Sequence, residues 1–342
     1  MRVAILGATG KTGQAIVDGL LESTTTKFEL TALTRPSSVD KPETQALKAR
    51  GVKIVPVDLT PSASLSARHN KASTEPAHVD RELVKILTGI DVVISATFFL
   101  NLAEQIPLID AAKVAGVGRF VPCNFQTVAP RGVMALADAK YEVLDHIQRI
   151  RQPYTIIEVG WWYQIALPRL PSGRFDNNKH IVYTAAELVV ADAGEGEGGK
   201  ASSSSNYLPS ALTDLRDVGR FVARIVADGE RTLNKCVFAY GEVLTHKQLW
   251  DTVERLSGEK LERNEVTPQM LEERIAQVPA DQQGKVGLPL AVHEYQRSWG
   301  VRGDNTPENA RFLGFLTTRE LYPDFQVTTH EEFVKDALAA AE

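Results

Sequence analysis

Six short apolar segments alternate with helical patterns over the first 160 residues, and this alternation restricts the chain to few folds. Strands that are apolar almost throughout are typical of a parallel sheet with both faces buried, and the helices between them supply the crossovers. We therefore predict an α/β fold with a doubly wound parallel sheet. The expected strands are residues 2–6, 29–33, 53–57, 91–96, 119–122 and 154–159, and the expected helices are residues 12–21, 81–87, 104–115 and 132–150.

A glycine-rich turn follows the first expected strand and opens the first expected helix. Its spacing is Gly-x-x-Gly-x-x-Gly, which is typical of short-chain dehydrogenases. Such a turn brings the backbone close to a pyrophosphate and directs free N–H groups of the helix toward the anion. A triphosphate-binding loop would need a glycine at position 5, where the chain has Ile5. We predict a Rossmann-type dinucleotide site formed by Gly7, Thr9, Gly10, Lys11, Thr12 and Gly13.

The end of the second strand indicates which dinucleotide binds. An acidic residue there suits the ribose 2′-hydroxyl of NAD, whereas a cation suits the 2′-phosphate of NADP. The chain has Arg35 at this place, with Ser37 and Ser38 as further hydrogen-bond donors. The pattern favours NADP(H) as the cofactor. The alternative is that Arg35 is an ordinary exposed loop arginine.

Further ligand contacts are expected where the other parallel strands end, because ligands bind outside the carboxyl ends of such strands. On the cofactor side these residues are Asp58, Ser95, Ala96, Thr97 and Asn124. Phe98 and Phe125 are expected to flank the nicotinamide and to contact the substrate, although either ring could instead be packing.

A lysine occupies the apolar stripe of the helix expected over residues 132–150. Lys140 takes the place of an apolar residue between Leu136 and Val143. An inward lysine is costly unless the amine has a task or reaches the protein edge. We predict that Lys140 contacts the cofactor and acts as the catalytic acid or base. The tyrosine that short-chain dehydrogenases carry four residues earlier is replaced by Leu136.

These motifs resemble the NmrA-like and isoflavone reductase-like family, an atypical short-chain dehydrogenase group. The resemblance rests on GATGKTG, TRPSS, ISAT, RFVPCNF and Lys140, and on two later stretches, TDLRDVGR and LYPD. The family includes phenylcoumaran benzylic ether, pinoresinol–lariciresinol and isoflavone reductases. The resemblance implies a catalytic Lys140 and a cofactor-side Asn124. The chain has Pro-Cys-Asn-Phe-Gln where the plant reductases have Pro-Ser-Glu-Phe-Gly.

After residue 160 the alternation becomes irregular, and we expect a smaller mixed α/β lobe. This gives an NADP(H)-binding domain over residues 1–160 and a substrate-binding lobe over residues 161–342, whose chain weaves back to the sheet. Strands are expected at residues 180–184 and 236–239, and helices at residues 215–227, 246–257, 268–277 and 330–340. Two polar segments are expected to be long loops. Residues 60–78 are expected to connect the third strand to its helix, and residues 193–206 are expected to form a mobile loop that is either a lid over a site or a solvated insertion.

Three consecutive aromatic residues follow the sixth expected strand. If Trp161, Trp162 and Tyr163 line the pocket, they favour a flat, apolar ligand; core packing is the alternative. The expected activity is an NADPH-dependent reduction of an activated C=C, C=N or related carbon in an aromatic or alkaloid-like molecule of specialised metabolism. A redox-coupled cyclase and a non-catalytic dinucleotide sensor of the NmrA type are the alternatives.

Composition and charge argue against other classes of partner. With 38 Lys and Arg against 43 Asp and Glu, the net charge of −5 does not favour nucleic acid. No apolar run approaches the length needed to cross a bilayer. Two cysteines and no glycosylation sequon suit the cytoplasm, and no metal-binding pattern occurs. We expect a monomer or a weak homodimer.

Overall fold

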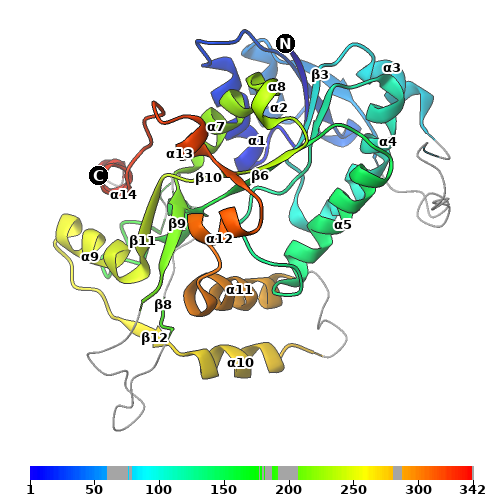
Figure 1. Ribbon diagram of the computed structural model, residues 1–342. Helices are drawn as coiled ribbons and strands as arrows, with labels where there is room; N and C mark the ends of the chain where they lie inside the picture. The colour runs from blue at the N-terminus through cyan, green and yellow to red at the C-terminus, as the bar shows by residue number, and fades with distance from the viewer. Residues whose placement is uncertain are drawn as a thin grey trace. The chain divides into compact units, whose positions relative to one another are not determined.

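A computed structural model describes residues 1–59, 76, 79–176, 178, 181, 187–191, 207–279 and 287–340 (Figure 1). The chain forms two compact units, each assembled from three segments. The first unit comprises Met1–Phe125, Ala139–Ile157 and Val218–Val237, and the second comprises Gln126–Asp138, Glu158–Asp217 and Phe238–Glu342. The units therefore interleave along the chain. The ligand roles expected for residues 1–160 and 161–342 stay predictions.

The first unit contains a parallel sheet of five strands in the order β3-β2-β1-β4-β5. In register, Val3 of the central strand lies between Leu30 and Val92 of its two neighbours. This order and the burial of β1, β4 and β5 confirm the predicted α/β, Rossmann-type fold. The strands are β1 (Arg2–Leu6), β2 (Glu29–Thr34), β3 (Lys53–Pro56), β4 (Val92–Ser95) and β5 (Arg119–Val121).

The sixth expected strand does not extend this sheet. Tyr154 forms a single parallel bridge with Phe120, and β6 (Thr155–Val159) then pairs in a different sheet, of order β13-β10-β6. Its apolar composition predicted a buried strand, and β6 is buried, but composition does not specify the pairing partner.

Helices cover the first sheet as the crossover pattern predicted. The backbones of α1 and α7 touch at two glycines: a β-carbon on Gly19 would lie 2.1 Å from the carbonyl carbon of Gly219. The helical elements are α1 (Lys11–Leu21), η1 (Pro36–Ser38), α2 (Pro42–Ala49), α3 (Arg81–Leu87), η2 (Phe99–Glu104), α4 (Gln105–Ala115), α5 (Ala135–Arg149), α7 (Leu215–Ala227) and α8 (Gly229–Thr232). Because α5 and α7 begin in the second unit, only their later residues belong to the first.

The strands of the second unit pair in small sheets of two or three strands. One has the order β11-β9-β7, in which β9 is antiparallel to β11 and parallel to β7, and another pairs β12 with β8. The strands are β7 (Trp161–Trp162), β8 (Glu187–Val189), β9 (Pro209–Thr213), β11 (Glu242–Thr245), β12 (Asn264–Val266) and β13 (Leu316–Thr317), together with the end of β10 (Lys235–Ala239), which begins in the first unit. Among these, the sequence pattern predicted only β10.

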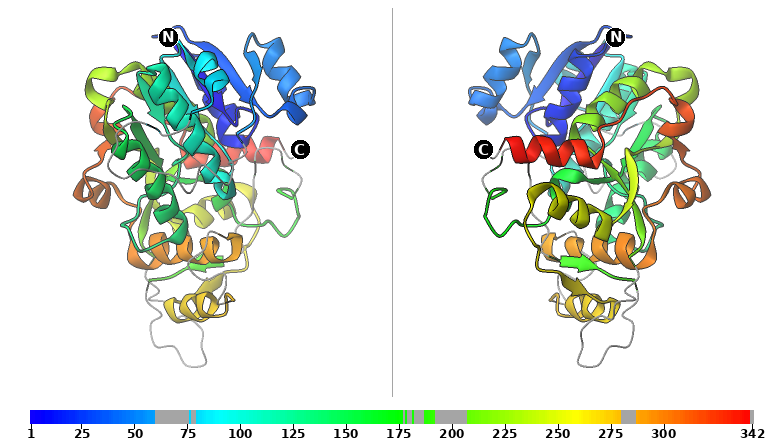
Figure 2. Two further views of the ribbon diagram at one scale, coloured as in Figure 1. Left: turned by 90° about the vertical axis from the view of Figure 1, so that its right-hand side faces the viewer. Right: turned by 90° about the vertical axis from the view of Figure 1, so that its left-hand side faces the viewer.

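In the second unit α9 packs against α14, and both helices contribute to an apolar core (Figure 2). Each of these two helices begins with a capping box, Thr245 with Gln248 and Thr329 with Glu332. The helical elements are α6 (Tyr163–Ala166), α9 (His246–Ser257), α10 (Pro268–Ala276), α11 (Leu288–Gln296), the π-helical η3 (Arg297–Arg302), α12 (Pro307–Phe312), α13 (Thr318–Leu321) and α14 (His330–Ala339).

Three sequence-based expectations fall largely outside the described residues. These are the loops over residues 60–78 and 193–206, of which the structure describes only residue 76, and the strand over residues 180–184, of which it describes only Ile181, as coil. Within the described part of the chain, no helix combines the length and apolar character that crossing a membrane requires.

Candidate functional site

The glycine turn of the first unit is closed so tightly that two of its positions leave no room for a side chain. A β-carbon on Gly13 would lie 2.0 Å from the carbonyl oxygen of Gly7. Gly7 itself has φ +78°, and a β-carbon there would lie 2.4 Å from the carbonyl oxygen of Ala96. The Gly10 N–H donates to the Gly7 carbonyl at 3.0 Å, which completes the turn. Positions without a β-carbon are what close approach of the backbone to a pyrophosphate requires.

The first turn of α1 extends this cradle. Gly10 is the N-cap residue and supplies no side-chain oxygen to the N–H groups of the first turn, so these donors suit an external anion. Gln14 donates to the carbonyl of Thr9 at 2.8 Å and so braces the turn. Lys11 is exposed and Thr12 half-buried at the start of the helix.

Arg35 lies where the sequence predicted, immediately after β2, and its side chain is 56% exposed. Its Nη2 donates to Oε1 of Glu104 at 2.6 Å. Ser37 is exposed and Ser38 is half-buried in the η1 turn that follows. The sequence pattern does not single out Glu104, because the two partners lie 69 residues apart and no local pattern links them.

The segment after β4 presents small side chains first and an aromatic ring afterwards. Ser95 is fully buried, Ala96 is buried, and Thr97 is half-buried. Phe98 is 58% exposed, with its ring centroid 4.5 Å from that of Phe99. Asp58 is exposed after the edge strand β3.

The helix α5 places Lys140 at the carboxyl end of β5. The side chain is buried, and its Nζ donates to the backbone carbonyl of Asn124. The next residue, Phe125, is buried and has φ +37°, a left-handed conformation that is strained for an aromatic residue. The backbone N–H of Phe125 donates to the Ile157 carbonyl at 3.0 Å. The inward lysine and this strained turn therefore lie at one end of the sheet in the first unit.

The three consecutive aromatic residues of the second unit have two different environments. Trp161 and Trp162 are half-buried in β7. The Trp161 ring centroid lies 5.2 Å from that of Tyr295 and 6.0 Å from that of Trp299. Trp161 therefore belongs to an aromatic cluster that Tyr295 and Trp299 complete from a distant part of the chain.

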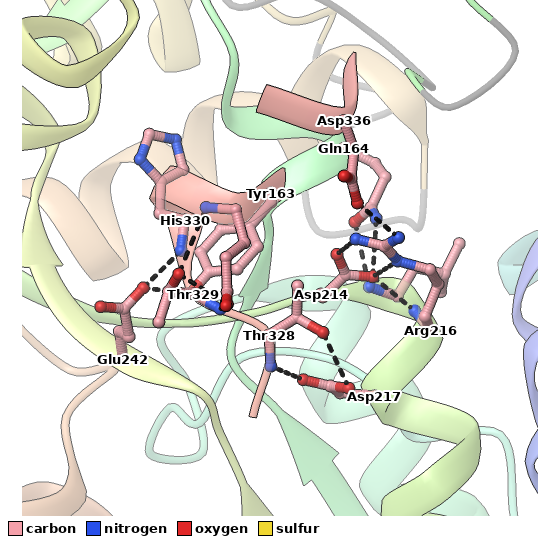
Figure 3. Close-up of polar contacts among 12 residues, drawn as sticks. Tyr163, Gln164, Asp214, Arg216, Asp217, Glu242, Thr328, Thr329, His330 and Asp336 are labelled. Carbon is pink, nitrogen blue, oxygen red and sulfur yellow. Dashed lines mark hydrogen bonds and ion pairs between the residues drawn. The ribbon is translucent and has the colours of Figure 1, made fainter. Parts of the chain in front are cut away.

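Tyr163 has no exposed surface and packs in the core of the second unit. Its hydroxyl donates to Oε2 of Glu242 at 2.8 Å, and burial, together with the Glu242 charge, raises the pKa of Tyr163 far above its usual value. The same carboxylate oxygen accepts the backbone N–H of His330 at 2.5 Å (Figure 3). The Tyr163 side chain therefore anchors the start of α14, and we assign it to packing rather than to the ligand surface.

A second anchor of this segment lies beside the first. Asp217 accepts the backbone N–H of Thr328 at 2.6 Å, and Arg216 donates both to Asp214 and to Asp336 of α14 (Figure 3). These contacts join the C-terminal helix to the beginning of α7 within the second unit.

A small cavity of about 10 Å³ lies next to the aromatic cluster, with room for one water-sized group. Nδ1 of His246 and Nε1 of Trp299 are buried without a hydrogen-bond partner among the described residues. Burial lowers the pKa of His246 to about 3, so its ring is neutral near pH 7. The cavity is lined by Trp161, Ser210, Leu212, Leu244, His246, Leu249 and Trp299.

In the described parts of the chain, no three His, Cys, Asp or Glu side chains form a group that could hold a metal ion. The first unit thus holds a glycine cradle, an arginine at the end of β2 and a buried lysine at the end of β5. The second unit holds an aromatic cluster.

The NmrA-like family pattern matches residues 1–334. Asnovolin J 5′,6′-dehydrogenase nvfM of Aspergillus novofumigatus is 41% identical, over 99% of this chain and 95% of its own length. Phenylcoumaran benzylic ether reductase Betv6 of Betula pendula is 28% identical, over 98% of this chain and 97% of its own.

One solved structure with a similar fold is the binary complex of leucoanthocyanidin reductase with NADPH from Vitis vinifera. It has a TM-score of 0.72 and 21% identity, and the match covers 99% of this chain and all of that chain. At this identity the similarity concerns the fold.

Proposed function

This chain belongs to the NmrA-like family, and we propose that it is an NADP(H)-dependent oxidoreductase of specialised metabolism. The proposed substrate is an apolar, ring-bearing small molecule of aromatic or alkaloid-like character, reduced at an activated C=C, C=N or related carbon. The observation that carries the proposal is the buried Lys140, held at the carboxyl end of β5 in the unit that also contains the glycine cradle.

The residues present fit a dinucleotide. Gly7 and Gly13 keep the pyrophosphate surface clear of β-carbons, and the α1 N-terminus supplies N–H donors. Arg35 supplies a cation at the strand end where a 2′-phosphate would bind. When bound, NADP(H) supplies or accepts the hydride.

Lys140 supplies the proton chemistry in this proposal. Burial of the amine would be costly without a polar task, and the Asn124 carbonyl fixes its position. From there Lys140 holds a ribose hydroxyl or passes a proton to and from the substrate. Leu136 stands where related dehydrogenases carry a tyrosine, so that position offers no phenol.

The substrate class is supported by the aromatic cluster and by the relatives. Trp161 and Tyr295 are half-buried, so their rings retain accessible surface that suits a flat apolar ligand. The two relatives quoted above are named for a dehydrogenation and a reduction. Because an enzyme accelerates both directions of a reaction, either direction is compatible with one site.

Binding and turnover of the purified protein test this proposal. We expect NADPH to quench tryptophan fluorescence saturably, and asnovolin J with NADP⁺, used as a probe, to give a time-dependent rise in NADPH absorbance. Absence of NADPH binding by the folded wild-type protein would contradict the proposed function. Binding without turnover on any ring-bearing probe would favour a dinucleotide sensor.

A further inference from the structure

The ion pair between Arg35 and Glu104 connects two segments on opposite sides of β1. Arg35 follows β2, and Glu104 is the last residue of η2, which follows β4. Because β2 and β4 are the two neighbours of β1, the pair spans the carboxyl end of the strand that leads into the glycine turn. A carboxylate therefore lies 2.6 Å from the guanidinium expected to bind the 2′-phosphate.

Both partners are attached to well-anchored backbone. The Arg35 carbonyl accepts the Ser38 N–H at 2.8 Å. Gln105, the residue after Glu104, is 1% exposed, and its side-chain oxygen accepts the backbone N–H of Cys123 at 2.8 Å. The Glu104 side chain is only 18% exposed, so solvent screens its charge less than that of an ordinary surface carboxylate.

We propose that Glu104 is a specificity-determining residue that limits the preference of this site for NADP(H) over NAD(H). A 2′-phosphate bound by Arg35 competes with Glu104 for the guanidinium and is repelled by the carboxylate. The 2′-hydroxyl of NAD(H) is neutral and can donate to a carboxylate, so it meets no such penalty. This inference rests on the proposed function, which places the 2′ position at Arg35.

The test compares dissociation constants of NADPH and NADH for the wild-type protein and Glu104→Gln, measured by fluorescence quenching and calorimetry. We expect the variant to bind NADPH about 3- to 10-fold more tightly, because it removes a negative charge that competes with the 2′-phosphate for Arg35 in a partly screened site. NADH affinity should change less than about twofold. Glu104→Asp keeps the charge, so its NADPH-to-NADH affinity ratio should stay close to that of the wild-type protein.

The chain offers a matched control in a second ion pair of the same unit. Asp18 of α1 pairs with Arg50 at 2.7 Å, and both side chains are partly exposed. Asp18→Asn changes the net charge by the same amount as Glu104→Gln, but away from the carboxyl ends of the strands, where the dinucleotide is expected to bind. We expect it to leave the NADPH-to-NADH affinity ratio unchanged.

The outcomes separate this inference from the proposed function. Weaker NADPH binding by Glu104→Gln would mean that Glu104 orients Arg35 favourably, and would overturn the inference. An unchanged ratio, or an equal shift in Asp18→Asn, would also overturn it while leaving the proposed function intact. If the folded wild-type protein binds neither dinucleotide, the proposed function fails. Glu104→Ser, which also removes the charge, replaces Glu104→Gln if that variant does not fold.

Discussion

The α-carbon of Gly13 faces the carbonyl oxygen of Gly7 so closely that a β-carbon would lie 2.0 Å from it. The first turn of α1 therefore lies directly against Gly7, the residue that follows β1 and begins the glycine turn. No rotamer relieves such a contact, because it involves a β-carbon and a backbone oxygen. The contact explains why position 13 requires glycine irrespective of any ligand.

Gly13→Ala should displace the turn and weaken NADPH binding at least tenfold, with a loss of about 1–3 kcal/mol in the free energy of unfolding from overpacking. Gly10→Ala is the control for stability, because a β-carbon there would lie 3.4 Å from the nearest atom, an ordinary contact distance. Thermal unfolding and NADPH titration of both variants check the prediction. Equal stability loss in the two variants would contradict the steric explanation.

Arg35→Ala should weaken NADPH binding by about 10- to 100-fold, since charge-assisted hydrogen bonds contribute roughly 1.5–3 kcal/mol. NADH binding should change little, because its 2′-hydroxyl carries no charge. Parallel titrations with the two dinucleotides give the result. If Arg35→Ala binds NADPH as tightly as the wild-type protein does, Arg35 does not recognise a 2′-phosphate.

Lys140→Ala should lower turnover by about 10²- to 10⁴-fold, the usual contribution of a general acid or base. NADPH binding should persist if the pyrophosphate and 2′-phosphate contacts supply most of the affinity. Single-turnover measurements with NADPH bound distinguish the two effects. Unchanged turnover would return Lys140 to a structural role, in which its methylenes pack and its amine binds the Asn124 carbonyl.

Acid should destabilise the protein through His246 and His330. Burial lowers their pKa values to about 3 and about 4, below the ordinary value of 6.5. The unfolded chain therefore binds protons more readily than the folded protein. The free energy of unfolding keeps its full contribution from the two neutral histidines above pH 6.5 and falls as the pH drops toward these pKa values. At pH 5 each histidine should cost about 2 kcal/mol.

Denaturant unfolding at pH 7 and pH 5 measures this effect. His246→Leu removes one titrating group, so the variant should lose less stability between the two pH values than the wild-type protein. The substitution should be nearly neutral at pH 7, because His246 Nδ1 has no partner to lose among the described residues. An identical pH dependence in both proteins would show that His246 is not buried neutral.

Tyr163→Phe should reduce the free energy of unfolding by about 1–3 kcal/mol, because Glu242 loses a hydrogen-bond donor in a partly buried site. NADPH affinity should be unchanged, since the residue belongs to the core of the second unit. Chemical denaturation and NADPH titration together check this. A change in substrate affinity without a change in stability would place Tyr163 at the ligand surface.

The parts of the fold that follow from local patterns were predictable, and those that depend on distant partners were not. Lys140 stood out because helical periodicity put it on the buried stripe, and its amine is indeed buried. Tyr163 follows two half-buried tryptophans, and nothing local distinguishes a core aromatic residue from a pocket residue. The partners Glu104 and Trp299 lie far along the chain from Arg35 and Trp161, so only the folded structure brings them together.

The interleaving of the two units has a consequence for synthesis of the chain. The first unit is completed by its third segment, Val218–Val237. This segment supplies Gly219, the α7 partner of Gly19 in the contact between α1 and α7. The ribosome must therefore release α7, which ends at Ala227, before α1 acquires this packing partner. Until then, the surface of α1 that packs against α7 is uncovered. We expect chaperone engagement to persist until α7 has emerged, rather than to end when β5 is complete.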